Sequence, residues 1–187
     1  MARLRNLSHG MYGAWRLARL DPAAMAWFER GIGGVWRSFW GAAIAYPSFI
    51  LAAGWTVAPA QWAAAGTIRI LLVMTLAYVA LRAAFPLIIL YFCDWLERGE
   101  QSLDLIIAYN WSLVLRTALP LGAILAATAL PWPAAGLVAL AVVAAQLSYL
   151  WFIARTALDA GGVAATAVVL IDLVLAAAVS EAAQSLY

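Results

Sequence analysis

The chain has little of what most catalytic and metal-binding proteins use. Its 187 residues contain no lysine, one cysteine, one histidine and only 11% charged residues. The lone Cys93 excludes an internal disulfide, and the neighbouring Asp94 supplies no positive charge that would activate the thiol. The lone His9 has no second histidine, cysteine pair or acidic cluster nearby, so the sequence predicts no metal and no cofactor.

Catalytic side chains in a familiar arrangement are also missing. The sequence shows no serine–histidine–aspartate set, no paired histidines, no glycine-rich phosphate loop and no inward pair of carboxylates. Membrane proteases and lipid transferases normally show one of these arrangements. We therefore expect a protein that is not an enzyme, and we expect no nucleic-acid partner.

Apolar residues are what the chain has in excess. Hydrophobic residues make up 67% of the sequence, and the mean hydropathy is +0.92. A soluble domain is about half apolar and about a quarter charged, so we predict an integral membrane protein. All basic residues are arginine in an alanine-rich background, which is typical of a GC-rich bacterial genome and predicts the bacterial inner membrane.

Five apolar runs are long enough to cross a membrane as helices, which takes about 20 residues each. The predicted fold is all-α, with a transmembrane domain over 38–187 and a cytoplasmic N-terminal segment over 1–37. The predicted spans are 38–58, 70–92, 105–130, 134–154 and 162–181. A tight hairpin at Pro131-Trp132-Pro133 joins the third span to the fourth, because proline cannot continue a helix there.

The arginines predict the orientation, because cytoplasmic loops carry an excess of positive charge. Eight of them fall on one side of the predicted spans: Arg3, Arg5, Arg16, Arg19, Arg30, Arg37, Arg98 and Arg155. We therefore expect a cytoplasmic N-terminus and, after five crossings, a periplasmic C-terminus. Aromatic residues near the span ends, such as Trp36, Tyr91 and Tyr149, are expected to anchor the protein at the membrane interface.

The N-terminal segment has the pattern of an amphipathic helix. Its apolar residues share one face: Leu4, Leu7, Met11, Trp15 and Ala18. Three arginines cluster on another face: Arg5, Arg16 and Arg19. This pattern predicts a helix in the membrane interface with its arginines on anionic headgroups. Gly10 and Gly13 weaken the helix and favour ordering on the membrane, and the pattern does not separate an anchor from a partner-docking surface.

A second short helix is expected after the amphipathic one. Asp21 is suited to cap its N-terminus, and Pro22 fits its first position. Gly31 is expected to end it.

Polar residues inside the spans are the main clue to function. Arg82 and Arg116 lie in near-copies of one heptapeptide, at 81–87 and 115–121, which match at five of seven positions. Asp172 and Gln146 interrupt later spans. From the expected cytoplasmic ends, these four side chains lie about 8 to 11 residues deep, or roughly 12–17 Å at the rise of a helix. Four helices thus place their strongly polar side chains in one layer.

Matched depth predicts contact within this layer. We expect Asp172 to take one guanidinium bidentately and Gln146 to cap the remainder, which leaves one arginine over. Its charge can be met by backbone carbonyls, by snorkelling or by an anionic ligand. Structural ion pairing, an anion or lipid-headgroup site and a transport pathway remain open, because intramembrane charges mark all three.

Prolines accompany both buried arginines. A proline removes the N–H that would bond the carbonyl four residues earlier, so Pro86 frees the carbonyl of Arg82 and Pro120 that of Arg116. Helix kinks are expected at both prolines and at Pro47. The two heptapeptides would form an inverted pair, a device that transporters use around midplane sites. Asn110 and Thr117 lie on one helix face, where hydrogen bonding between helices is expected.

Several loop segments and the residues that follow them are similar to those of one family. The loop Glu97-Arg98-Gly99-Glu100-Gln101-Ser102 leads into a span with Tyr109 and Pro120, and Trp151 precedes Leu158-Asp159-Ala160-Gly161-Gly162-Val163-Ala164-Ala165. With five spans and a tight third-to-fourth hairpin, residues 38–187 resemble the bacterial branch of the Yip1-like membrane proteins. The resemblance implies a non-enzymatic protein that works through partners or lipids, and it assigns no catalytic residues. Eukaryotic members carry a longer soluble N-terminal region than the 37 residues that precede the first predicted span in this sequence.

Two functions are expected from these patterns. The first is an accessory, scaffold or assembly component of a larger membrane complex, with a protein partner or a second copy of the chain. Small residues that allow close helix packing lie along the last two spans: Gly136, Ala139, Ala144, Ala145, Ala164, Ala165, Ala167, Ala176 and Ala177. The second is a small transporter or a lipid- or anion-binding protein that uses the buried Arg/Asp layer.

Overall fold

The computed structural model describes residues 2–187, with side chains from Asn6 onward, and this part of the chain is helical without strands. The elements are α1 (Ala2–Ala18), the 3-10 helix η1 (Pro22–Trp27), α2 (Gly31–Thr56), α3 (Pro59–Ala65), α4 (Thr67–Trp95), α5 (Gly99–Ala127), α6 (Trp132–Leu158) and α7 (Gly162–Gln184). Among the described residues, four helices, α4 to α7, are long and apolar enough to cross a membrane. The count becomes five if α2 and α3, which meet at a bend of 103°, form one broken span.

Several helices extend beyond the runs predicted from hydrophobicity. α2 begins at Gly31 rather than near residue 38, and α5 begins at Gly99 rather than near residue 105. The length of an apolar run matches the thickness of the hydrocarbon layer. A helix can extend past that run, because its backbone hydrogen bonds do not depend on apolar side chains. Polar and aromatic residues therefore belong to helix ends that the apolar pattern did not include.

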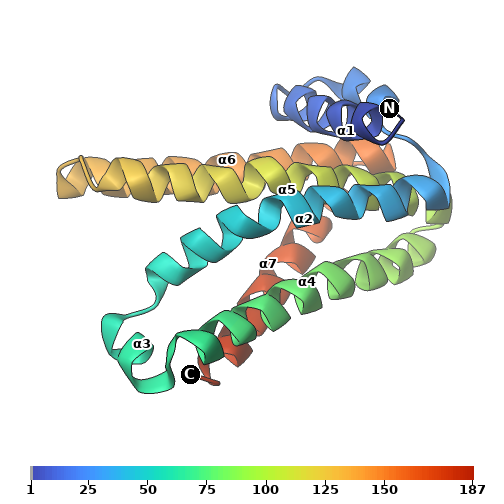
Figure 1. The fold of residues 1–187 in the computed structure, drawn as a ribbon. Coiled ribbons are helices and arrows are strands. Elements are labelled where there is room, and N and C mark those ends of the chain that lie inside the picture. The colour runs from blue at the N-terminus through green and yellow to red at the C-terminus, as the bar shows by residue number, and fades with distance from the viewer. Residues whose placement is uncertain (1) are drawn as a thin grey trace.

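Helix α5 is the centre of the molecule. α2 packs along it, α6 returns antiparallel to it, and both α1 and α4 also contact it. In Figure 1, α5 and α6 run side by side to a hairpin that lies far from α3 and from the C-terminus. α2, α4 and α7 run instead towards α3, so the molecule opens into two branches.

Burial along α5 changes abruptly where the branches separate. Every residue from 105 to 113 is buried, and no residue from 114 to 148 is. The buried stretch contributes most of its side chains to the main hydrophobic core. The unburied stretch covers the rest of α5, the hairpin and the first half of α6.

Helix α1 packs against the protein through a face that its apolar pattern did not indicate. Ala14 and Leu17 are buried, whereas Met11, Trp15 and Ala18, on the predicted apolar face, are exposed. Gly10 and Gly13 also lie on the packed side. A Cβ added at Gly10 would come within 2.2 Å of the Trp111 ring, and one at Gly13 within 2.9 Å of Phe28. The glycines expected to weaken α1 are thus what lets it approach the bundle.

The short helix confirms one part of its prediction and corrects another. The Asp21 carboxylate accepts a 2.9 Å hydrogen bond from the amide of Ala23, and Pro22 occupies the first position. The prediction that Gly31 ends this helix was wrong. η1 ends at Trp27, and Gly31 begins α2 with a positive φ of 79°, which glycine adopts without strain.

Two contacts place α1 and the loops before α5 and α7 at one end of the molecule. The Tyr149 hydroxyl donates a 2.7 Å hydrogen bond to the carbonyl of Ala14, so the prediction of an interfacial anchor at this residue was wrong. Its side chain is buried under α1 instead. At the loops, Arg98 Nη1 donates to the carbonyls of Leu158 at 2.7 Å and Asp159 at 2.6 Å, which satisfies the end of α6.

Candidate functional site

An ion pair between α5 and α7 forms the centre of the predicted polar layer. Arg116 Nη2 donates to Asp172 Oδ2 at 2.6 Å, and the side chains are only 12% and 7% exposed. Asp172 was expected to take this guanidinium bidentately, and that prediction was wrong. Its second oxygen, Oδ1, accepts a 2.6 Å hydrogen bond from the hydroxyl of Tyr109, which is fully buried.

Arg82 is the arginine left over. It is 9% exposed and forms no ion pair within the described part of the chain. Its guanidinium lies over two aromatic rings, 5.2 Å from the centroid of Tyr78 and 5.4 Å from that of Tyr109. Nε and Nη1 are buried and have no hydrogen-bond partner there. The aromatic faces supply part of what a counter-ion would give, because a ring quadrupole attracts a cation.

The layer carries a surplus of positive charge. Arginine stays protonated in proteins, so one of its two cations has no anion to balance it. Two nitrogens of Arg116, Nε and Nη1, are also buried without a partner, and its guanidinium lies 5.3 Å from the centroid of Tyr109. Removing such a charge from water without pairing it is costly. This arrangement therefore favours the entry of one further negative charge.

Gln146 does not join the hydrogen bonds of the layer. Its side chain is half-buried on α6 and makes no hydrogen bond within residues 6–187. Tyr109 fills the role that was predicted for it. Equal depth on two helices does not bring side chains together unless their helix faces also point at one another.

The three prolines lie within continuous helices. Pro47, Pro86 and Pro120 are interior residues of α2, α4 and α5. Each removes one backbone donor, so the carbonyls of Arg82 and Arg116 lose their usual helical partner within the polar layer. Neither carbonyl accepts a hydrogen bond from the buried Nε or Nη1 of either arginine, so the freed acceptors do not meet the charge of these groups.

Aromatic neighbours of the arginines are the site residues that the sequence prediction missed. Tyr78 precedes Arg82 by one helical turn, and Tyr109 precedes Arg116 by two. Phe85 follows Arg82 by a turn, and its ring stacks on that of Tyr109 with centroids 3.7 Å apart. Spacings of three, four and seven place residues on one helix face. An aromatic residue at these distances from an intramembrane arginine was therefore the available signal.

Asn110 and Thr117 confirm the prediction of hydrogen bonds between helices. Asn110 Nδ2 donates to Ser38 Oγ at 2.9 Å, and the Thr117 hydroxyl lies 3.2 Å from the carbonyl of Ala45. Both partners belong to α2, so these residues join α5 to α2 and lie outside the charged layer. The Tyr78 hydroxyl makes a similar bond to the carbonyl of Ala42 at 2.6 Å.

The three arginines predicted for the membrane surface have different surroundings. Arg16 is partly buried and its Nε donates to Asp21 Oδ2 at 2.7 Å, which joins α1 to the start of η1. Arg19 is exposed at the end of α1. The side chain of Arg5 lies outside the described residues.

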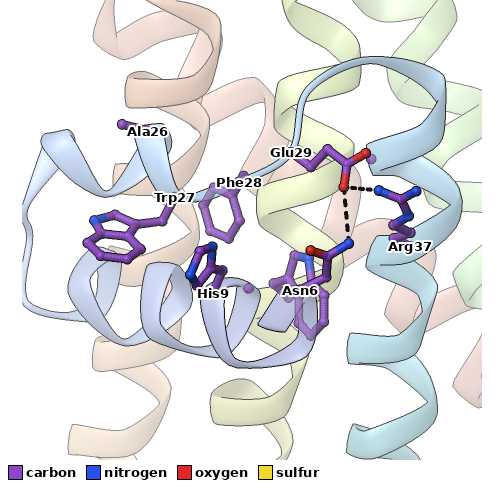
Figure 2. Close-up of a pocket in the computed structure, with 10 residues that line it drawn as sticks. Asn6, His9, Ala26, Trp27, Phe28, Glu29 and Arg37 are labelled. Carbon is purple, nitrogen blue, oxygen red and sulfur yellow. Dashed lines mark hydrogen bonds and ion pairs between the residues drawn. The ribbon is translucent and has the colours of Figure 1, made fainter. Parts of the chain in front are cut away.

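A shallow pocket lies between α1, η1 and the start of α2 (Figure 2). Its volume is about 220 Å³. Glu29 accepts hydrogen bonds from Asn6 Nδ2 at 3.4 Å and from Arg37 Nη1, and both partners are visible in the figure. His9 lies edge-on to Trp27 with ring centroids 5.4 Å apart. Glu29 and Arg37 are exposed and already paired with one another. The pocket therefore holds no unbalanced buried charge that a ligand would neutralise, unlike the buried layer.

Known proteins do not add to this picture. No protein-family model, no curated protein and no solved structure matches the chain. Within the described residues, no group of three or more histidine, cysteine or acidic side chains is placed to hold a metal ion. The buried Arg/Asp layer is therefore the candidate site, and it is defined by this chain's own geometry.

Proposed function

We propose that this chain is a non-enzymatic protein of the bacterial inner membrane that binds an anion in its Arg/Asp layer. The observation that carries the proposal is Arg82, a buried guanidinium with two unpartnered nitrogens and no carboxylate against it. Of the two expected functions, the geometry supports this one best.

Physical chemistry explains why an anion fits here. A hydrogen bond between ionised groups is about twice as strong as a neutral one, and low polarity around the site strengthens it further. Asp172 carries a single negative charge, which Arg116 already balances, and no ion pair joins it to Arg82 within the described residues. An anion beside Arg82 would balance the layer, whether it comes from a lipid or from solution.

The test compares Arg82→Met with Arg69→Met, which removes an exposed arginine from the same helix. Native mass spectrometry of protein released from membranes should show a bound anion in the unchanged protein and in Arg69→Met, and none in Arg82→Met. The Arg82 variant should also withstand heat better in ligand-free detergent, because methionine replaces a buried unpaired charge. Equal anion retention in all three proteins would overturn the proposal.

The orientation proposed for this protein is a cytoplasmic N-terminus and a periplasmic C-terminus. Support comes from Arg30, just before α2, whose Nε lies 3.6 Å from Asp104 in the first turns of α5, close in sequence to Arg98. Reporter fusions at each terminus that are active only in one compartment would test it. A periplasmic N-terminus would contradict it.

A second candidate function is that of an accessory or scaffold protein in a membrane assembly. The observation that favours it is the α5–α6 hairpin, where no residue from 114 to 148 is buried and where Gly122 and Gly136 have open space beside them. The Yip1-like resemblance agrees with a role carried out through partners. Pairs of cysteines introduced along α6 would test it, since a second copy or another spanning helix should crosslink there. Failure of every such pair to crosslink in native membranes would remove this candidate.

A further inference from the structure

A chamber lies next to the polar layer, between α2, α4 and α7. Its volume is about 320 Å³. Its walls are mainly apolar: Phe49, Met74, Ala77, Leu81, Ala176 and Val179. Polar residues line it near the ends of α2 and α7, where Thr56, Ser180 and Gln184 are exposed. The chamber therefore has an apolar body and a polar rim at the end of the molecule that holds α3 and the C-terminus (Figure 1).

Arg82 does not line this chamber, but residues next to it in the fold do. Leu81 lines the chamber and directly precedes Arg82, and Ala176 lies one helical turn beyond Asp172 on α7. The ring of Phe49, another wall residue, lies 4.7 Å from the ring of Tyr78. The same Tyr78 ring lies 5.2 Å from the Arg82 guanidinium. The Tyr78 ring thus lies next to both the chamber wall residue Phe49 and the unpaired cation.

We infer that the chamber and Arg82 together bind a monocarboxylate with an apolar body, in the manner of a fatty acid. The apolar body fills the chamber, and the carboxylate lies against Arg82 once the Tyr78 ring turns aside. This inference rests on the proposed function, because it gives a chemical class to the anion that Arg82 binds. It adds the route of entry and the part of the ligand that the chamber recognises.

The number of charges favours a monoanion. The layer holds two guanidinium groups and one carboxylate, so a single negative charge balances it. A phosphate dianion would exceed that balance inside an apolar environment. Burying an unbalanced charge there is costly for either sign.

The chamber walls favour an apolar body over a bare ion. Among the described residues, no charged side chain lines the chamber, and its polar side chains gather at the rim. A bare ion between the rim and Arg82 would have lost its water without gaining a partner. An alkyl chain in the same place leaves water and contacts Phe49, Met74 and Val179, which is favourable over the whole area buried.

Binding of radiolabelled laurate to the full chain in nanodiscs of zwitterionic lipid tests the inference, with empty nanodiscs subtracted. The variants are Arg82→Met, which removes the cation, and Ala176→Phe, which fills the chamber. Ala177→Phe is the matched control, because Ala177 is the next residue of α7, is exposed and does not line the chamber. We expect each of the first two variants to bind laurate at least tenfold more weakly than the unchanged protein, and Ala177→Phe to bind it equally.

The possible results separate the inference from the function on which it rests. If Arg82→Met loses laurate while Ala176→Phe retains it, the anion site stands and the chamber is not part of it. If acetate or chloride displaces laurate at equal concentration, the apolar body is not recognised and the inference fails. If Arg82→Met binds laurate as the unchanged protein does, the anion site itself is wrong. A circular-dichroism spectrum of each variant keeps a loss of binding distinct from a loss of fold.

Discussion

The two halves of α5 show how differently one helix can be held. Every residue of α5 from 105 to 113 is buried, whereas none of its residues from 114 onward is. Arg116 lies immediately after the change, and its partner Asp172 lies on α7. The ion pair thus joins two helices at the level where close packing stops.

This difference separates two ways of holding helices together in an apolar environment. In the packed half, small residues let backbones approach, as at Gly41, where an added Cβ would come within 2.6 Å of the carbonyl of Asn110. At the boundary, the helices are held by the Arg116–Asp172 ion pair and the Tyr109–Asp172 hydrogen bond rather than by close packing. Beyond the boundary, α5 and α6 run side by side to the hairpin (Figure 1). Substitutions in the packed half of α5, at the boundary and beyond it should therefore change the stability of the protein by different amounts.

Loss of the carboxylate at the boundary should have the largest effect. Asp172→Ala leaves Arg116 and Tyr109 without their acceptor and should lower the free energy of unfolding by about 3–5 kcal/mol. Denaturation by SDS titration measures it. Glu181→Ala, which removes an exposed acid from the same helix, is the control and should change little. Adding Arg116→Met to Asp172→Ala should restore part of the loss. Equal stability of Asp172→Ala and the control Glu181→Ala would contradict the role given to the ion pair.

A cavity in the packed half should come next. Ile106→Ala removes a buried side chain from α5 and should cost about 2–5 kcal/mol of unfolding free energy. Leu125→Ala makes a similar truncation in the exposed half of the same helix and should cost well under about 1 kcal/mol. The same SDS titration compares them. Similar costs for both would mean that the hairpin is covered by something in the membrane, which would favour the assembly role.

Removal of one hydroxyl should have a smaller effect. Tyr109→Phe keeps the ring that lies beneath both arginines and removes its hydrogen bond to Asp172. Hydrogen bonds to charged groups contribute about 1.5–3 kcal/mol, so the midpoint of thermal unfolding should fall. Tyr91→Phe is the control, because Tyr91 is exposed on α4. An unchanged midpoint in Tyr109→Phe would show that Asp172 does not depend on this donor.

Glycine substitutions should give effects of opposite sign at the close contact of α2 with α5 and in the exposed half of α5. Gly41→Ala forces α2 away from the α5 backbone and should destabilise the protein by about 1–3 kcal/mol. Gly122→Ala meets nothing within 4 Å and should stabilise α5 by about 0.5–1 kcal/mol through helix propensity. Thermal unfolding of both variants in one detergent decides the sign. Stabilisation by Gly41→Ala would contradict the close approach of α2 and α5.

Much of this architecture was accessible from the sequence, because hydrophobic length alone determines which runs can cross a membrane. Depth along the helices also predicted that Arg116 and Asp172 share a layer and that one arginine is left over. Depth did not predict which arginine is left over, because Arg82 and Arg116 lie at similar depth and have similar neighbours in sequence. The role of Tyr109 was missed for the same reason, because a tyrosine in an apolar run has the pattern of a core aromatic.

The packing of α1 was hidden for a different reason. A hydrophobic face is easily read from sequence, whereas a face that fits because it lacks side chains is not. Gly10 has meaning only once Trp111 is in place, a hundred positions later in the chain. Close approach depends on the partner surface, and the partner surface is known only from the fold.

The bond between Tyr149 and Ala14 has a consequence for the order in which the protein is made. Its two ends lie 135 positions apart. At about 5–20 residues per second, synthesis separates their appearance by roughly 7–27 s. The surface that receives α1 includes Trp111 and Tyr149, so it does not exist until α5 and α6 have been inserted. The first helix to leave the ribosome is thus among the last to reach its final place, and until then its Trp15 and Met11 are free to hold it at the lipid surface.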